Sequence, residues 1–287
     1  VYIFFLLSGY MFGNQEMHNS IQWVIKRLKR ILIPYYVFMC ILFSYYFILG
    51  KVYAPFQYLK YFLNIQGFDT NHVSGAAHLW FLTIIMICYF ITPLLYKYRN
   101  TLTLKRMCML FPFILILQLV LSYGINSMIG LYLGYIYIYI CGYIFRFRNT
   151  DFDKKKNLGY ITLLLIVGII IRIVARKYTD GTVLYDVIAV TICSCFLSVW
   201  IFNVVIYGIR NIHMLNNKQL KTFIFSIEKI TYNIYIVHYM LLTGPFYMMK
   251  TTYPMVINLI LFFIITYLLA VALSSMERVI KHLISHN

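Results

Sequence analysis

The sequence predicts an all-α protein, a polytopic bundle of transmembrane helices. Of its 287 residues, 62% are hydrophobic and only 11% are charged, whereas ordinary soluble domains are roughly 45–50% apolar. The aromatic share is 19%, with 28 Tyr and 23 Phe, which suits spans whose ends carry amphipathic rings at the headgroup layer. This composition excludes a soluble enzyme with one core, a disordered tail and a disulfide-stapled secreted module.

The apolar runs place the spans in order along the chain. A helix needs about 20 apolar residues to cross the hydrocarbon layer. Eight runs come close to this length: Ile31–Leu49, Leu79–Tyr96, Met107–Tyr123, Ser127–Phe145, Gly159–Ala175, Leu184–Tyr207, Thr231–Met248 and Met255–Ser275. A ninth run, Val1–Phe12, is half a span and begins without an initiator Met or a signal peptide. We therefore expect about nine spans here and about ten in a complete protein, with at least one helix upstream of Val1.

The positions of Lys and Arg predict the orientation, because positive residues stay preferentially on the cytoplasmic side. One set of alternate connections and the C-terminal tail holds 18 of the 25 basic residues: Lys26, Arg27, Lys29, Arg30, Lys97, Arg99, Lys105, Arg106, Arg146, Arg148, Lys154, Lys155, Lys156, Arg210, Lys218, Lys221, Arg278 and Lys281. The opposite set holds six: Lys51, Lys60, Arg172, Arg176, Lys177 and Lys250. The remaining basic residue, Lys229, stands at the start of a span. The richer side is predicted to be cytoplasmic and to include the C-terminus. The scattered charges do not form a nucleic-acid surface.

The connections are short, without a flexible linker or a detectable repeat, which predicts one membrane domain over residues 1–287. The long outer connection Gly50–Ala77 carries Asp69 and His72. We interpret it as an ordinary aromatic-rich surface loop, with a re-entrant segment or a lid over a cavity as the alternative. The six cysteines lie in apolar runs without metal-ligand spacing, so neither a metal nor a disulfide is predicted.

A basic cluster precedes the first full span. Arg27 and Arg30 are three residues apart and project from one face of a helix. Two guanidinium groups so placed form a fork for phosphate oxygens, which Arg binds bidentately. The alternative is a topology anchor, the usual role of basic residues at a membrane boundary.

Two histidines are candidates for chemistry. His78 lies beside Trp80 at the outer end of a span, where Trp is a common interface anchor. His238 lies about 10 Å into a predicted span, counted from Thr231. Ionisable groups at that depth usually face a cavity or a partner. Tyr235 and Thr231 precede His238 by three and seven residues, which predicts a polar stripe on one helix face. A neutral imidazole can accept a proton from a hydroxyl, although a structural histidine is the alternative.

Four motifs, in order, resemble those of the membrane acyltransferase 3 family. They are F-F-L-L-S-G-Y-M (Phe4–Met11), R-L-K-R-I-L-I-P-Y-Y (Arg27–Tyr36), H-L-W-F-L from His78, and T-Y-N-I-Y-I-V-H (Thr231–His238). The resemblance implies a bundle of about ten helices that O-acylates sugars of surface polysaccharides and related glycans. The H-L-W-F-L segment is most similar to acetyltransferase members. The donor would be acetyl-CoA or another acyl-CoA, with no metal.

The resemblance also implies site residues. Arg27 and Arg30 match the R-x-x-R motif thought to hold the CoA phosphates, and their predicted cytoplasmic position agrees. Ser8 and Gly9 match small residues that allow close helix approach or line a pore. Trp80 and Tyr235 are candidates for lining the substrate cavity, and His238 and His78 are catalytic candidates. The family's expected base, a histidine ten residues after an arginine in the first helix, would lie upstream of Val1.

The implied location is the bacterial cytoplasmic membrane, with the lipid bilayer, acyl-CoA, a glycan acceptor and glycan-assembly proteins as partners. A polar-lined bundle with a histidine at membrane depth also suits a transporter or flippase for a glycan or an acylated intermediate. A non-catalytic remnant is the third interpretation.

Overall fold

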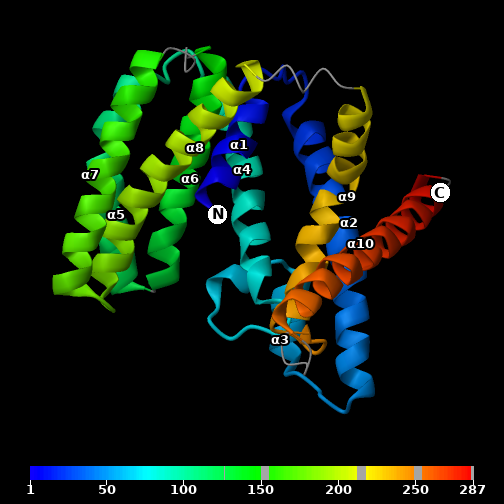
Figure 1. The fold of residues 1–287 in the computed structure, drawn as a ribbon. Coiled ribbons are helices and arrows are strands. Elements are labelled where there is room, and N and C mark those ends of the chain that lie inside the picture. The colour runs from blue at the N-terminus through cyan, green and yellow to red at the C-terminus, as the bar shows by residue number, and fades with distance from the viewer. Residues whose placement is uncertain (126, 150–154, 212–217, 249–253, 286–287) are drawn as a thin grey trace. The chain divides into compact units, whose positions relative to one another are not determined.

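The computed structural model describes residues 1–125, 127–149, 155–211, 218–248 and 254–285. These residues form helices and no strand (Figure 1). The ten α-helices are α1 (Tyr2–Phe12), α2 (Ser20–Ile48), α3 (Pro55–Phe62), α4 (Trp80–Lys97), α5 (Leu104–Gly124), α6 (Ser127–Phe147), α7 (Lys155–Thr179), α8 (Thr191–Asn211), α9 (Lys218–Leu242) and α10 (Met255–Ser285). Short helical turns are η1 (Gln66–Phe68), η2 (Ala77–Leu79) and the π-helical η3 (Tyr185–Val190).

The predicted polytopic membrane bundle is confirmed. Seven described helical segments are long and apolar enough to cross a membrane: α2, η2 with α4, α5, α6, α7, η3 with α8, and α10. The span predicted at Thr231–Met248 forms α9, which is not among the seven. Polar residues such as Glu228, Asn233 and His238 lower the mean hydropathy of this helix. Helix α2 also begins 11 residues before the predicted Ile31, because Lys and Arg favour helix although they do not favour hydrocarbon.

The chain divides into two compact units. The first comprises Val1–Ser20 and Ile87–Met214, and the second comprises Ile21–Met86 and Leu215–Asn287. Helix α4 contributes its first turns to the second unit and the rest to the first. The single domain expected from the sequence stays a prediction.

In the first unit, α1 packs against α6 at glycines on both helices. A Cβ atom placed on Gly9 would lie 1.9 Å from the carbonyl oxygen of Tyr139, and one on Gly142 would lie 2.1 Å from that of Leu6. Absent side chains therefore let the two backbones touch, as small residues do between membrane helices. Gly9 therefore lies at a close contact between two helix backbones. The half-span α1 is buried along this seam, with Phe5 and Leu6 fully covered.

Basic residues gather at one end of the first unit, as their alternation in the sequence predicts. The Arg148 guanidinium donates hydrogen bonds to the carbonyl oxygens of Asn100 (2.6 Å) and Leu102 (3.0 Å). The Arg99 guanidinium lies over the Phe147 ring, 5.3 Å from its centre. The connections after α4 and α6 therefore meet. Lys154 and Lys250 lie outside the described residues.

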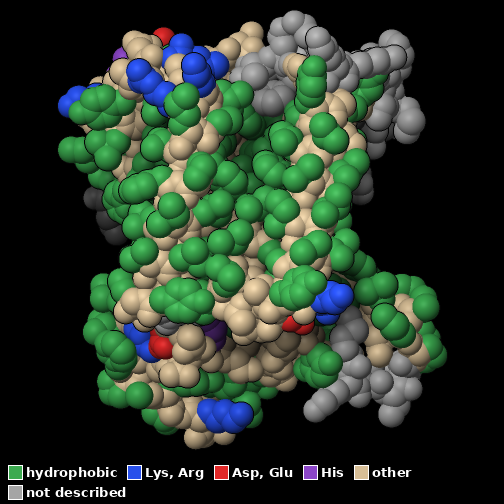
Figure 2. Space-filling model, turned by 90° about the vertical axis from the view of Figure 1, so that its left-hand side faces the viewer, with side chains coloured by type: hydrophobic (Ala, Val, Ile, Leu, Met, Phe, Trp, Pro, Cys, Tyr) green, Lys and Arg blue, Asp and Glu red, His purple; other side chains and the backbone are tan. Residues whose placement is uncertain are grey.

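Many apolar side chains are exposed on the surface of the protein. Figure 2 shows one face of the molecule on which hydrophobic side chains form a broad band, with Lys and Arg side chains above and below it. Helices α5 and α7 contribute exposed residues of this kind, including Phe113, Ile116, Val120, Ile166, Ile170 and Ile173. A surface of this composition suits contact with lipid chains.

In the second unit, α2 and α9 run side by side in the same direction. The Tyr232 hydroxyl of α9 donates to the carbonyl oxygen of Ile31 in α2 at 3.0 Å. Fourteen residues further along both segments, the rings of Tyr45 and Phe246 lie 4.7 Å apart. Helix α10 returns along α9, and the Asn233 amide donates to the Glu277 carboxylate at 3.4 Å.

The connection between α2 and α4 is folded, so its interpretation as an ordinary surface loop is wrong. It contains α3, η1 and η2. Its main-chain oxygens accept hydrogen bonds from α2: the Tyr35 hydroxyl donates to Tyr61 at 2.6 Å, and the Tyr46 hydroxyl donates to Ser74 at 3.0 Å. Proline at the start of α3 favours a helix there. Tyr61 packs inward, whereas Phe56 stays exposed.

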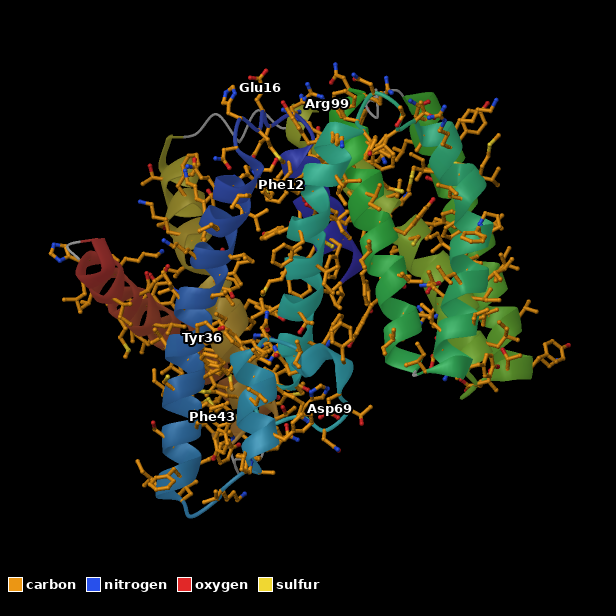
Figure 3. The ribbon with its side chains drawn as sticks, turned by 180° about the vertical axis from the view of Figure 1, so that it is seen from behind. Phe12, Glu16, Tyr36, Phe43, Asp69 and Arg99 are labelled. Atoms are coloured by element: carbon orange, nitrogen blue, oxygen red, sulfur yellow. The ribbon has the colours of Figure 1, made fainter. Side chains whose placement is uncertain are left out.

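The folded connection has a charged and aromatic interior. Lys60, only 7% exposed, pairs with Asp69. The Phe43 ring of α2 lies against Tyr58 of α3, with ring centres 4.6 Å apart. Figure 3 labels Phe43 on α2 and Asp69 in the connection. The alternative of a lid over a cavity stays a prediction.

Gly9→Ala is predicted to destabilise the protein by about 1–3 kcal/mol, since the new Cβ meets backbone that cannot yield cheaply. Thermal unfolding of the purified protein, followed by circular dichroism, measures this change. The matched control is Gly159→Ala in α7, because a Cβ there meets nothing within 4 Å and should be neutral or mildly stabilising. Equal melting temperatures for the two variants would contradict the helix-crossing role of Gly9.

His72 is predicted to make the folded connection acid-sensitive. Burial, and secondarily the Lys60 charge, lower the pKa of His72 below its ordinary 6.5. The unfolded segment therefore binds a proton more readily, and stability present above pH 6.5 is lost as the pH falls through the lowered pKa. Proteolysis between α2 and α4 should accelerate between pH 7 and pH 5. His72→Gln should flatten this dependence, whereas the exposed control His18→Gln should leave it unchanged.

Candidate active site

The two histidines proposed from the sequence, 160 residues apart in the chain, lie together in the second unit. The rings of His78 and His238 meet edge to face, with centres 5.0 Å apart. Two tyrosines of α9 flank His78: the ring centre of Tyr235 is 5.1 Å away, and Tyr239 stacks at 4.8 Å. We call His78, Tyr235, His238 and Tyr239 the histidine cluster.

Main-chain carbonyls fix the protonation of both rings. His78 Nε2 lies 3.2 Å from the Ile236 carbonyl oxygen, and His238 Nδ1 lies 2.7 Å from that of Tyr235. A carbonyl oxygen only accepts, so each of these nitrogens carries its hydrogen, and in the neutral ring the other nitrogen holds a lone pair. His78 Nδ1 and His238 Nε2 are therefore the basic atoms.

The two basic atoms differ in access. His78 Nδ1 is buried and has no hydrogen-bond partner among the described residues. The His238 side chain is half-buried, and its Nε2 is not enclosed in this way. His238 is thus the less enclosed of the two rings, and His78 packs against its side.

The segment before α4 holds His78 against α9. The Tyr235 hydroxyl donates to the His78 carbonyl oxygen at 2.7 Å, and the Ser74 hydroxyl donates to that of Thr243 at 3.3 Å. Gly75 adopts a φ of 78°, and a Cβ there would lie 3.1 Å from the Cβ of Met240. A glycine suits both requirements, the left-handed backbone and the close approach to α9.

The arginine pair lies on the neighbouring helix of the same unit. Arg27 is half-buried, with its guanidinium 5.4 Å from the Trp23 ring centre, and Arg30 is exposed. The next residue, Ile31, contacts Tyr232 of α9. His238 is six residues beyond Tyr232, or about 9 Å along the helix. The arginines and the histidine cluster therefore lie at different depths along two parallel helices.

The remaining site candidates have other surroundings. Ser8 and Gly9 belong to the first unit, where Gly9 serves helix packing. Trp80 stands two residues after His78 in the first turn of α4, with the Phe81 ring centre 6.4 Å away. Thr231, expected on the polar stripe, is exposed, and its hydroxyl donates back to the Ile227 carbonyl at 2.8 Å.

The comparison with protein families decides the relationship. Residues 1–275 match the family model described as an acyltransferase domain, Acyl_transf_3. The chain belongs to the membrane acyltransferase 3 family. The comparisons with curated proteins and with solved structures found no match.

Membership in the acyltransferase 3 family makes the chain a multi-pass membrane protein of an acyltransferase kind. The four motifs that suggested this relationship fall within the matched residues. Two of them, H-L-W-F-L and T-Y-N-I-Y-I-V-H, supply the two halves of the histidine cluster. The matched region thus includes the place where the acyltransferase brings imidazole groups together.

Sequence reasoning missed three residues of this region. Tyr239 stacks on His78, Phe81 places its ring centre 5.5 Å from that of Tyr235, and Asn233 binds Glu277. Tyr239 lies four residues after Tyr235, on the same helix face, but its partner His78 belongs to another segment, which spacing within one helix does not predict. The signal available was the density of aromatic residues beside each histidine.

Proposed function

We propose that this acyltransferase is a membrane O-acyltransferase, specifically an O-acetyltransferase. It moves an acyl group from cytosolic acyl-CoA to a hydroxyl of a cell-surface polysaccharide or another glycan. The observation that carries the proposal is the histidine cluster, in which a half-buried imidazole with a fixed tautomer lies in the same unit as a pair of arginines. Ester formation from a thioester needs such a proton acceptor.

The proposed chemistry is transfer of an acyl group from the thioester sulfur of acyl-CoA to a hydroxyl oxygen of the acceptor. His238 Nε2 accepts the proton of the acceptor hydroxyl as its oxygen attacks the thioester carbonyl. The tetrahedral intermediate collapses, the carbon–sulfur bond breaks, and the imidazolium returns the proton to the CoA thiolate. The products are the O-acyl glycan and free CoA. His78 and Tyr235 are positioning residues, since their contacts orient His238 and the segment that carries it.

The proposed donor site uses the basic end of α2. Arg27 and Arg30 bind CoA phosphates through charge-assisted hydrogen bonds. A thioester attached through the long pantetheine arm then reaches deeper along α2 and α9, toward the histidine cluster. The arginines lie about 10–15 Å from the level of His238 along these helices, a separation that suits a donor whose phosphates and reactive carbonyl are far apart.

The proposed acceptor approaches from the opposite end of the second unit. Trp80 lies beside the histidine cluster, at the end of α4 that joins the folded connection. An indole ring of this kind can pack on the face of a sugar. The location proposed is the bacterial cytoplasmic membrane with a cytoplasmic C-terminus, which the gathering of basic residues at one end of the first unit supports.

His238→Gln is predicted to lower kcat by about 10²–10⁴-fold with little change in KM, because an amide cannot accept the hydroxyl proton. The assay follows acetyl transfer from labelled acetyl-CoA to glycan in proteoliposomes. His18→Gln is the matched control and should retain activity. A fully active His238→Gln variant would exclude His238 as the base, and glycan movement without acetyl-CoA would identify a transporter instead.

Arg27→Lys and Arg30→Lys are each predicted to raise KM for acetyl-CoA by about tenfold or more while changing kcat less. Lysine keeps the positive charge and loses the bidentate contact with phosphate, a difference of about 1.4 kcal/mol per tenfold. Arg176→Lys is the control, since this arginine lies at the end of α7 and is 72% exposed. Unchanged binding of acetyl-CoA to both α2 variants would contradict the proposed donor site.

A further inference from the structure

An apolar groove of about 440 Å³ lies between α2 and α10 in the second unit. This volume falls within the roughly 300–1,000 Å³ typical of small-molecule sites. The one hydroxyl in its lining, on Tyr36, is engaged outside the groove, where it donates to the Phe62 carbonyl oxygen at 2.7 Å. Figure 3 labels Tyr36 on α2. The lining residues are Ile33, Tyr36, Val37, Cys40, Ile41, Met276 and Ile280.

The face of α2 that lines the groove continues into a positively charged stripe. The lining positions 33, 36, 37, 40 and 41 follow the three- and four-residue spacing of one helix face. The same spacing, extended toward the start of the helix, reaches Lys29 and Arg30 and then Lys26. All three side chains are exposed. One helix face therefore carries a basic end and an apolar remainder.

The length of α2 places the boundary between these parts at the membrane surface. The helix has 29 residues and is about 44 Å long. Its apolar part from Ile31 to Ile48 measures about 27 Å, close to the hydrocarbon thickness of about 30 Å. Lys26, Lys29 and Arg30 then lie at the level of lipid headgroups, and the groove opens directly below them among the acyl chains.

We propose that this groove is a binding site for an anionic phospholipid. The acyl chain lies along the apolar face from Ile33 to Ile41, and the phosphate lies against Lys26, Lys29 and Arg30. Charge complementarity selects this occupant, because each Lys or Arg near the surface favours anionic lipid by about fivefold. A glycan finds no free hydrogen-bonding group on the groove lining. The inference does not require the proposed catalytic function, although Arg30 belongs to both proposed sites.

A fluorescent reporter in the groove tests the lipid selectivity. Cys40 lines the groove and is exposed, and Cys108 is the other exposed cysteine. Bimane is attached to Cys40 in a Cys108→Ser background, and the full chain is reconstituted in phosphatidylcholine vesicles. Brominated phosphatidylglycerol or brominated phosphatidylcholine is then titrated into these vesicles over the same range of mole fractions. We expect brominated phosphatidylglycerol to quench the bimane at several-fold lower mole fraction.

Matched variants separate the site from general lipid contact. Lys26→Gln with Lys29→Gln should abolish the excess quenching by phosphatidylglycerol, and Lys177→Gln on α7 should preserve it. Bimane on Ile166→Cys, an exposed position of α7, with Cys40 and Cys108 replaced by Ser, should be quenched equally by both lipids. Equal quenching at Cys40 by the two lipids would overturn the proposal.

A label-free measurement guards against interference by the bimane group. Native mass spectrometry of the purified protein should show retained phosphatidylglycerol, which Cys40→Trp removes by filling the groove. Retention by Cys40→Trp as strong as by the unmodified chain would place the lipid elsewhere and sink the assignment. Neither measurement requires turnover.

Discussion

The hydrocarbon layer offers no water to main-chain N–H and C=O groups, so every such group within it must be satisfied by the protein. This constraint makes the described chain helical and also shapes its candidate active site. A carbonyl oxygen in a helix uses one lone pair for the helical hydrogen bond and keeps a second. The carbonyls of Tyr235 and Ile236 offer that second lone pair to His238 and His78. The same groups that stabilise α9 therefore also set the tautomers of the two imidazoles.

Close approach of backbones is the second requirement, and each unit meets it with glycine. In the first unit, Gly9 and Gly142 let α1 and α6 touch. In the second, Gly75 brings the segment before α4 against Met240 of α9, which places His78 beside His238. The consequence differs between the units, since the first contact buries a short helix and the second assembles polar groups. A larger residue at Gly75 would separate the histidines without touching either of them.

Hydrophobic runs and charge alternation predicted most of the fold, because membrane thickness and the cytoplasmic bias of Lys and Arg act on the sequence directly. They did not predict α3, whose eight residues are too few to span and which packs on α2 through Tyr58 and the buried Tyr61. The sequence also identified Tyr235 and His238 together on one helix face, and His78 separately. Their meeting could not be derived, since 160 residues separate the two histidines and spacing within one helix says nothing about packing between segments. Tyr239 was missed for the same reason.

The basic end of helix α2 belongs to both the proposed donor site and the proposed lipid site. Arg27 is half-buried near Trp23, while Lys26, Lys29 and Arg30 are exposed on the stripe that leads into the groove. Because Arg27 and Arg30 are about 60° apart around the helix, Arg30 stands between the proposed donor site and the proposed lipid site. A lipid phosphate held mainly by Lys26 and Lys29 leaves Arg30 available to the CoA phosphates, whereas one held by Arg30 would compete with the donor. The number of basic residues on this stripe thus allows an anionic headgroup and an anionic donor to share one end of the helix.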